Sequence, residues 1–372
     1  MRTVLILLAA AAALVGSAVA QAPASVDANA ISAAAPPQVL SAYHFFRDAG
    51  ARQPNAGVTP YDLNTPLYSD GALKFRYLYL PPHTQATYRE DGVFDLPVGA
   101  VLIKTFAFAG DMRRPTENVR FLETRLLIHR ANGWVAYPYV WNEAQTEARL
   151  SPIGATVPIG FTDTDGSSVA LDWAVPNVNQ CKGCHDRAGA ITPIGPTARN
   201  LNRPLRESSR EPDFDPVHGL AVRPSPENQL LHWVNHGWLD RLPNDAPHFA
   251  DAYDPASGTL AERSRAYLQV NCAHCHNPEG PAHTSGLDLR YDDTTPVQWG
   301  VHKRPVAAGR GSSTFEFDIA PGHPEQSILL YRMNSTDPGE MMPELGRQRV
   351  DARAIALMRE WIAQMNADGS SR

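Results

Sequence analysis

After its first twenty residues, the sequence has no apolar run long enough to cross a bilayer, no cluster of basic residues and no internal repeat of fixed period. Its 33 Lys and Arg residues are scattered among 39 Asp and Glu residues, and the formal net charge is −6. A bundle of membrane-spanning helices, a repeat array and a basic surface for nucleic acid are therefore not expected. We expect no nucleic-acid partner and no stable membrane span in the mature chain.

Cysteine is equally scarce, and its placement is informative. The chain of 372 residues has only four cysteines, all within two short motifs. The pattern therefore does not suggest a framework of disulfides between distant segments, although an exported protein meets an oxidising compartment.

The N-terminal segment predicts export. Arg2 supplies a positive charge, residues 4–15 form an apolar run, and Ala18-Val19-Ala20 is a small-x-small cleavage site. Together these parts are typical of a secretory signal peptide spanning residues 1–20, with cleavage after Ala20. An uncleaved N-terminal anchor is the alternative. We expect a periplasmic location for the mature chain.

The four cysteines lie in two C-x-x-C-H motifs, which consist of Cys181, Cys184 and His185, and of Cys272, Cys275 and His276. This pattern is the attachment signature of c-type haem. On one helical turn the two sulfur atoms reach the two vinyl groups of one porphyrin, and the adjacent histidine ligates the iron. The sequence thus predicts two covalently attached haem c groups.

Three other interpretations compete with haem attachment. A C-x-x-C pair can be a redox-active disulfide, but the expected βαβ pattern is absent from the sequence. Four cysteines and two histidines could bind zinc, although motifs about ninety residues apart are unusual for a zinc site. Two local structural disulfides are the third option, and each would close only a very short loop.

The second motif has a setting typical of small cytochromes c. Residues 261–270 predict a helix that enters the motif, and Asp351 is a good N-cap for a C-terminal helix with apolar periodicity. Between them lies Met342, followed by proline, whose thioether suits low-spin haem iron. We predict Met342 as the distal ligand of the second haem, with Met341 as the alternate and Met333 as a weaker candidate.

The distal ligand of the first haem is less defined by the sequence, because no methionine lies between His185 and Met333. Ser225-Pro226-Glu227 predicts a helix start, and the helix would extend to about residue 236. We predict His232 on this helix as the sixth ligand. A five-coordinate iron is the alternative, and the other histidines in reach are His218, His236 and His248.

The region before the first motif predicts a β-rich domain. Residues 75–80 and 101–108 are strand candidates, and two further strand-like runs flank Asn132-Gly133, a strong hairpin signal. The predicted fold class is multidomain α+β, with a β-rich N-terminal domain followed by two mainly helical cytochrome c-type haem domains. The expected parts are a signal peptide 1–20, a linker 21–45, a β-rich domain 46–165, a first haem domain 166–255 and a class I-like cytochrome c domain 256–372.

Several segments resemble a known family. They are YDLNTPLYSD (61–70), YPYVWNE (137–143), VPN (175–177), PIGP (193–196) and RNLN (199–202). They resemble bacterial dihaem c-type cytochromes of unassigned function. The last third resembles the planctomycete-type cytochrome c domain, in which PGHPEQS (321–327) leads towards Met342. The resemblance covers nearly the whole mature chain and implies two haems, an exported location and a His/Met second site, but no activity.

The sequence therefore favours electron transfer, with a redox partner protein or a small electron donor or acceptor. A haem enzyme such as a dihaem peroxidase is the alternative, and it would require an open first haem. A redox sensor or binding module is the third class. Whether the chain is an enzyme is left open, and an enzyme would be an oxidoreductase.

Overall fold

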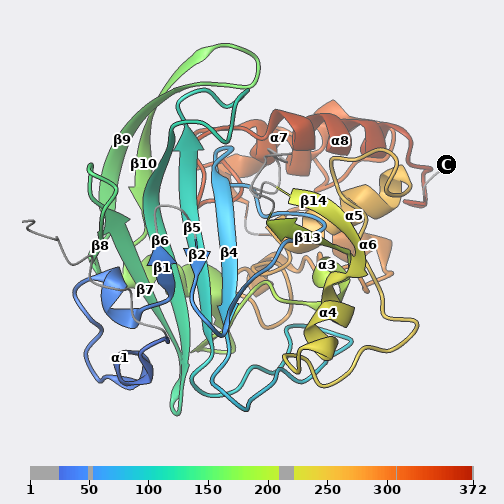
Figure 1. Cartoon of the computed structure of the whole chain (residues 1–372). Coiled ribbons are helices and arrows are strands. Elements are labelled where there is room, and N and C mark those ends of the chain that lie inside the picture. Colours follow the sequence, from blue (N-terminus) through green and yellow to red (C-terminus); the bar gives the residue numbers. More distant parts are fainter. Residues whose placement is uncertain (1–24, 49–52, 209–221, 307, 371–372) are drawn as a thin grey trace, which may run out of the picture.

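The computed structural model describes residues 25–48, 53–208, 222–306 and 308–370 (Figure 1). It shows a mixed α+β fold, in which a β-rich N-terminal region precedes a more helical C-terminal part. The predicted signal peptide and its cleavage after Ala20 lie within residues 1–24, which are outside the described residues. His218 lies in residues 209–221, which are also outside them.

A six-stranded antiparallel sheet organises the N-terminal region, with strand order β3-β4-β5-β6-β7-β8. Its strands are β3 (Val58–Pro60), β4 (Leu73–Tyr79), β5 (Val101–Ala109), β6 (Val119–Arg130), β7 (Gly133–Trp141) and β8 (Ala148–Leu150). The predicted hairpin around residue 132 is confirmed, because Arg130 pairs with Gly133 at the β6–β7 turn.

The remaining strands form four two-stranded hairpins. They are β1 (Phe46–Asp48) with β2 (Gln53–Pro54), β9 (Ala155–Thr162) with β10 (Ser168–Val175), β11 (Asp186–Arg187) with β12 (Ala190–Ile191), and β13 (Pro204–Ser208) with β14 (Val222–Asn228). The boundary predicted between residues 165 and 166 lies in the turn of the β9–β10 hairpin.

Most α-helices follow the sheet. The α-helices are α1 (Ala28–Ser32), α2 (Val178–His185), α3 (Ala198–Leu201), α4 (Gln229–Asn235), α5 (Leu260–Asn271), α6 (Pro296–Trp299), α7 (Ile328–Asn334) and α8 (Ala352–Ala363). Short 3-10 turns are η1 (Leu40–Tyr43), η2 (His283–Ser285), η3 (Gly309–Ser312) and η4 (Pro324–Gln326). Among the described residues, none of these helices is long and apolar enough to cross a membrane.

Helix α4 begins later than the sequence predicts. Residues 222–228 pair with β13 as strand β14, so the predicted start at Ser225 is wrong. The cap is Asn228, whose side chain accepts hydrogen bonds from the backbone N–H groups of Leu230 and Leu231. Strand pairing with a distant segment thus overrides a local helix-start pattern.

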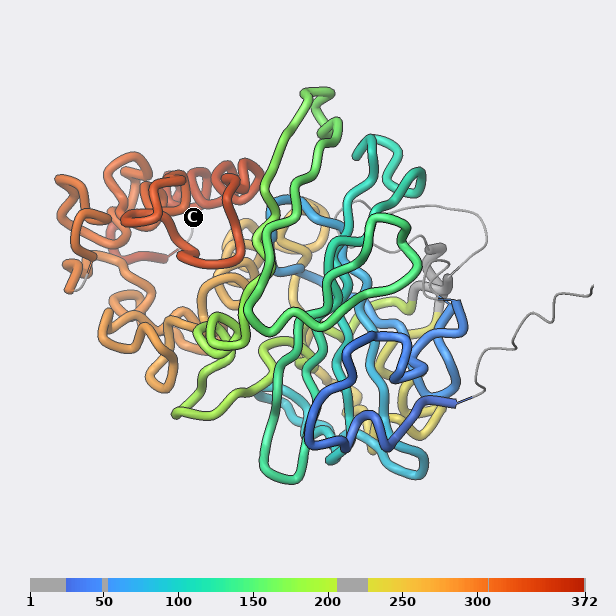
Figure 2. Tube along the Cα trace, turned by 90° about the vertical axis from the view of Figure 1, so that its left-hand side faces the viewer, coloured from blue at the N-terminus to red at the C-terminus, as the bar shows by residue number. Residues whose placement is uncertain are grey.

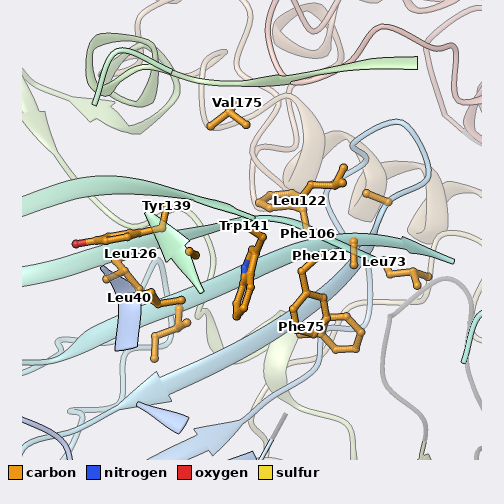
Figure 3. Close-up of a cluster of buried hydrophobic side chains, with 14 of the residues drawn as sticks. Leu40, Leu73, Phe75, Phe106, Phe121, Leu122, Leu126, Tyr139, Trp141 and Val175 are labelled. Atoms are coloured by element: carbon orange, nitrogen blue, oxygen red, sulfur yellow. The ribbon is translucent and has the colours of Figure 1, made fainter. Parts of the chain in front are cut away.

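Three apolar cores support these elements. One fills a face of the sheet, where the rings of Phe75 and Phe121 lie 5.6 Å apart and those of Phe121 and Trp141 lie 5.1 Å apart (Figure 3). A second joins residues 61–100 to residues 198–239 around the fully buried Trp233. The third packs α5 against α8, as the sequence predicts for the second motif.

The C-terminal part lies beside the sheet. Figure 2 shows the orange-to-red C-terminal part on one side of the molecule and the blue-to-teal sheet on the other, with the green β9–β10 hairpin between them. Arg349 forms an ion pair with Asp163 in the hairpin turn, and the Gln348 amide donates to the Asp172 carbonyl in β10 at 2.5 Å. The hairpin therefore joins the two parts.

Leu126 tests the sheet core, because its side chain is fully buried at the centre of β6. We expect Leu126→Ala to lower the free energy of unfolding by about 2–5 kcal/mol through lost burial and a residual cavity. The control Ile153→Ala, at a residue 87% exposed, should change it by less than about 0.5 kcal/mol. Urea unfolding followed by circular dichroism measures both, and equal losses would contradict this core assignment.

Candidate functional site

The first C-x-x-C-H motif forms most of helix α2. Asn177 caps this helix reciprocally with Gln180, which fixes the first turn. At its end the Nδ1 atom of His185 lies 2.7 Å from the Thr192 carbonyl oxygen, in the segment that follows the β11–β12 hairpin. Because a carbonyl oxygen only accepts, this bond places the proton on Nδ1. Nε2 is therefore unprotonated, and its lone pair is available to a metal, as in iron-ligating histidines.

The second motif begins at the C-terminus of α5, where Cys272 caps the helix. The Nδ1 atom of His276 lies 3.0 Å from the Ser285 hydroxyl oxygen, which itself donates to the Ala282 carbonyl. The Ser285 hydroxyl therefore accepts from the ring, and Nε2 of His276 is again left free. Burial lowers the pKa of both His185 and His276 to about 4, so each ring is neutral near pH 7.

The fold brings the two motifs into contact, although ninety residues separate them. The side chains of Cys184 and Cys275 lie close enough to affect each other. Cys275, together with His274, lowers the pKa of Cys184, and Cys184 raises the pKa of Cys275. Close to these cysteines, Arg187 and Glu279 form an ion pair, with Nε and Oε2 2.5 Å apart. We call this contact between Cys184 and Cys275 the motif junction.

The four cysteines are unpaired thiols, so neither local nor cross-motif disulfides are present. Burial raises the pKa of Cys272 to about 12 and also raises that of Cys181. Within the described ranges, no three His, Cys, Asp or Glu side chains are grouped as they would be around a metal ion. The zinc interpretation therefore has no geometric support there.

The loop that carries Met342 lies over the motif junction. Its backbone N–H donates to the Arg332 carbonyl, and its own carbonyl accepts two bonds from the buried Arg347 guanidinium, at 2.8 and 3.1 Å. Glu344 lies close enough to Cys275 for its charge to raise the pKa of that thiol, and the Leu345 side chain lies next to Gly183 of the first motif. Met342 is partly exposed, whereas Met341 is 9% exposed.

His232 lies in a different cluster. Its Nδ1 atom is 2.9 Å from the Glu227 carboxylate, and its ring lies against that of His236, with centroids 4.0 Å apart and the planes tilted by 38°. The structure thus joins His232 to Glu227 and His236. The histidine that it brings to the first motif is His274, which lies against Cys184 and whose charge acts on His185.

Sequence reasoning did not single out His274, because it is one of the two variable positions of the second motif. The Nδ1 atom of its ring is buried and has no hydrogen-bond partner in the structure. Only the contact between the motifs reveals its position, and no local pattern in the sequence could have indicated it.

Residues 61–70 form a connecting segment that holds the regions of both C-x-x-C-H motifs to the sheet. Its first half binds the segment after the first motif, where Thr65 N–H donates to the Asn200 side chain at 2.9 Å. Its second half binds the second region, where Tyr68 N–H donates to Asn271 at 2.7 Å, directly before Cys272. Asp70 then accepts the N–H groups of Gln348 and Arg349 at 2.7 Å each.

No protein-family model, no curated protein and no solved structure matches this chain. The resemblance to dihaem cytochromes is therefore carried by the sequence segments alone.

A buried lysine in β4 gives the sheet a pH dependence. Lys74 is 5% exposed and donates to the Leu67 carbonyl at 2.6 Å, and burial lowers its pKa from 10.5 to about 7. Between these two values the unfolded chain binds more protons than the folded chain does. The contribution of Lys74 to stability is therefore complete above pH 10.5 and falls as the pH drops towards 7.

We expect Lys74→Met to remove this loss. As the pH falls from about 10 to about 7.5, the wild-type protein should lose stability relative to the variant, by up to about 1.4 kcal/mol per pH unit. Urea unfolding of both proteins across this range measures the difference. If the difference in free energy of unfolding between the two proteins stays constant with pH, the lowered pKa of Lys74 would be contradicted.

Proposed function

We propose that this chain is an exported dihaem c-type cytochrome that transfers electrons through two covalently bound haems, in the periplasm. The observation that carries the proposal is the motif junction, where two C-x-x-C-H motifs meet. A disulfide within each motif gives no reason for the two motifs to meet. A zinc site would group three or more of the motif side chains, and the described residues show no such group. Two redox groups that exchange electrons must lie close together.

The residues present fit covalent haem. Each motif offers two unpaired thiols and one neutral imidazole, whose Nδ1 is held by the protein while Nε2 is free. Haem bound at such a site supplies one-electron redox chemistry at its iron. The hydrogen bonds to the Thr192 carbonyl and the Ser285 hydroxyl orient the two rings and increase their basicity.

We further propose that the region after the sheet comprises two haem domains, and that the second resembles class I cytochromes c. The packing of α5 against α8 beside Cys272 supports this. Met342 is proposed as the distal ligand there, because Arg347 holds its backbone rigidly over the junction. A thioether ligand raises the potential, so the second haem is the site of exchange with a redox partner.

A haem enzyme is the second candidate, and one observation favours it. His232, the proposed sixth ligand of the first haem, is held by Glu227 and lies against the ring of His236. If His232 stays in that cluster, the distal position of the first haem is open to peroxide or another small ligand.

The number of bound haems tests the proposal. The full chain, expressed with its signal peptide in a host that matures c-type cytochromes, should carry two covalent haems, because both motifs present free thiols. Mass spectrometry should find one haem in the double variant Cys272→Ser/Cys275→Ser. No covalent haem in the wild-type chain would refute the proposal. A high-spin first haem that His232→Ala does not change would move the enzyme candidate ahead.

Met342→Ala and Met341→Ala form a matched pair for the distal ligand. We expect the near-infrared sulfur-to-iron band of the oxidised protein to be lost in Met342→Ala and kept in Met341→Ala, because only the first removes the ligating thioether. Magnetic circular dichroism measures this band. The opposite result would assign the ligand to Met341, and a band kept in both variants would exclude both residues.

A further inference from the structure

Three cationic side chains form a row across the middle of the sheet. Arg76 in β4 is directly opposite Lys104 in β5, and Lys104 is directly opposite Arg125 in β6. Directly paired residues in an antiparallel sheet point to the same face, with Cβ atoms about 4.5–5.5 Å apart. Like charges placed in this way destabilise a sheet, so the row needs anions to offset it.

Two carboxylates offset the ends of the row but not its centre. Asp62 lies 3.7 Å from Arg76 and 3.3 Å from the nearby Arg203, and Glu123, which is fully buried, lies 2.6 Å from Arg125. Glu123 also accepts a hydrogen bond from the Trp173 ring nitrogen at 2.9 Å. Both carboxylates are therefore paired with other cations and not with Lys104.

Lys104 has no carboxylate or hydrogen-bond partner within the described part of the chain. Its Nζ atom lies over the Phe106 ring, 4.9 Å from the centroid. The charged groups that act on it are Lys74, Arg76, Arg125 and Glu123, so cations outnumber anions around it. Lys104 is partly buried, and a partly buried cation among other cations is stabilised when an anion joins it.

The row faces the first motif. Helix α2 packs against β7, the strand next to β6. The charge of Arg125 acts on Cys181 and Cys184, and the charge of Lys104 acts on His185. The surplus positive charge of the sheet is therefore directed at the place where the first haem would be attached.

We propose that Lys104 binds a propionate carboxylate of the haem attached at Cys181 and Cys184. Arg125, whose charge acts on the two thiols, lies towards the opposite, thioether edge of that haem. This inference rests on the proposed function, since it needs a haem at the first motif. The carboxylate supplies the anion that the row lacks, and the row holds it ionised. Lys104 is thus a positioning residue that sets the potential of the first haem.

The test is a potentiometric titration of the exported chain with both haems bound, followed by visible and magnetic circular dichroism spectra. In Lys104→Met the potential of the first haem should fall, because removal of a nearby cation favours the oxidised form. We expect about a tenfold change in the ratio of oxidised to reduced haem, which equals 59 mV for a one-electron couple. The potential should also become pH-dependent, because the propionate is no longer held ionised.

Lys303→Met is the matched control. Lys303 is 13% exposed and its charge acts on His276 of the second motif, so this variant should leave the first potential unchanged. Lys104→Arg keeps the charge and should restore a potential close to that of wild type. Met342→Ala identifies which titration step belongs to the second haem.

Three results would overturn the inference while leaving the proposed function intact. The first is an unchanged potential of the first haem in Lys104→Met, and the second is a loss of potential in Lys104→Arg equal to that in Lys104→Met. The third is a shift of the wild-type potential on addition of acetate, which would show that a free carboxylate and not a propionate occupies the row. Failure of the proposed function is recognised separately, since spectra would then show no haem at the first motif.

Discussion

The motif junction is the contact on which the account depends. Cys184 and Cys275 belong to motifs ninety residues apart, and no local structure brings them together. The connecting segment 61–70 does so, because it binds the region after the first motif through Asn200, and the second region through Asn271 and the backbone at residues 348–349. Asp70 is central to this arrangement, since its buried carboxylate satisfies two backbone N–H groups that would otherwise lack partners.

The sheet has two different faces, and each has its own role. One face carries aromatic and aliphatic side chains such as Phe75 and Leu126 and supplies the stability of the N-terminal region. The other carries Arg76, Lys104 and Arg125 and is directed towards the first motif. The β-rich region therefore supplies both the apolar core and a row of charged side chains. It packs beside α2, and its cationic side chains act on the first motif.

Local patterns predicted much of the fold. The β6–β7 hairpin, the helix that enters the second motif and the capping of α8 by Asp351 all follow from short-range rules, and the structure contains them. The start of α4 was predicted wrongly, because pairing of residues 222–228 with β13 is a long-range interaction. The cationic row was not predictable for a similar reason. Arg76, Lys104 and Arg125 are each isolated in the sequence, and only strand register places them together. His274 likewise gains its position from the junction alone.

Electron exchange between the two sites within one chain tests the central claim most directly. Photochemical reduction of the first haem in the exported protein should be followed by transfer to the second haem, which the thioether ligand gives the higher potential. The rate should not change when the protein is diluted, because both sites meet at the motif junction. A transfer rate that falls in proportion to protein concentration, or no transfer at all, would show that the two sites are not joined within the chain and would contradict the account.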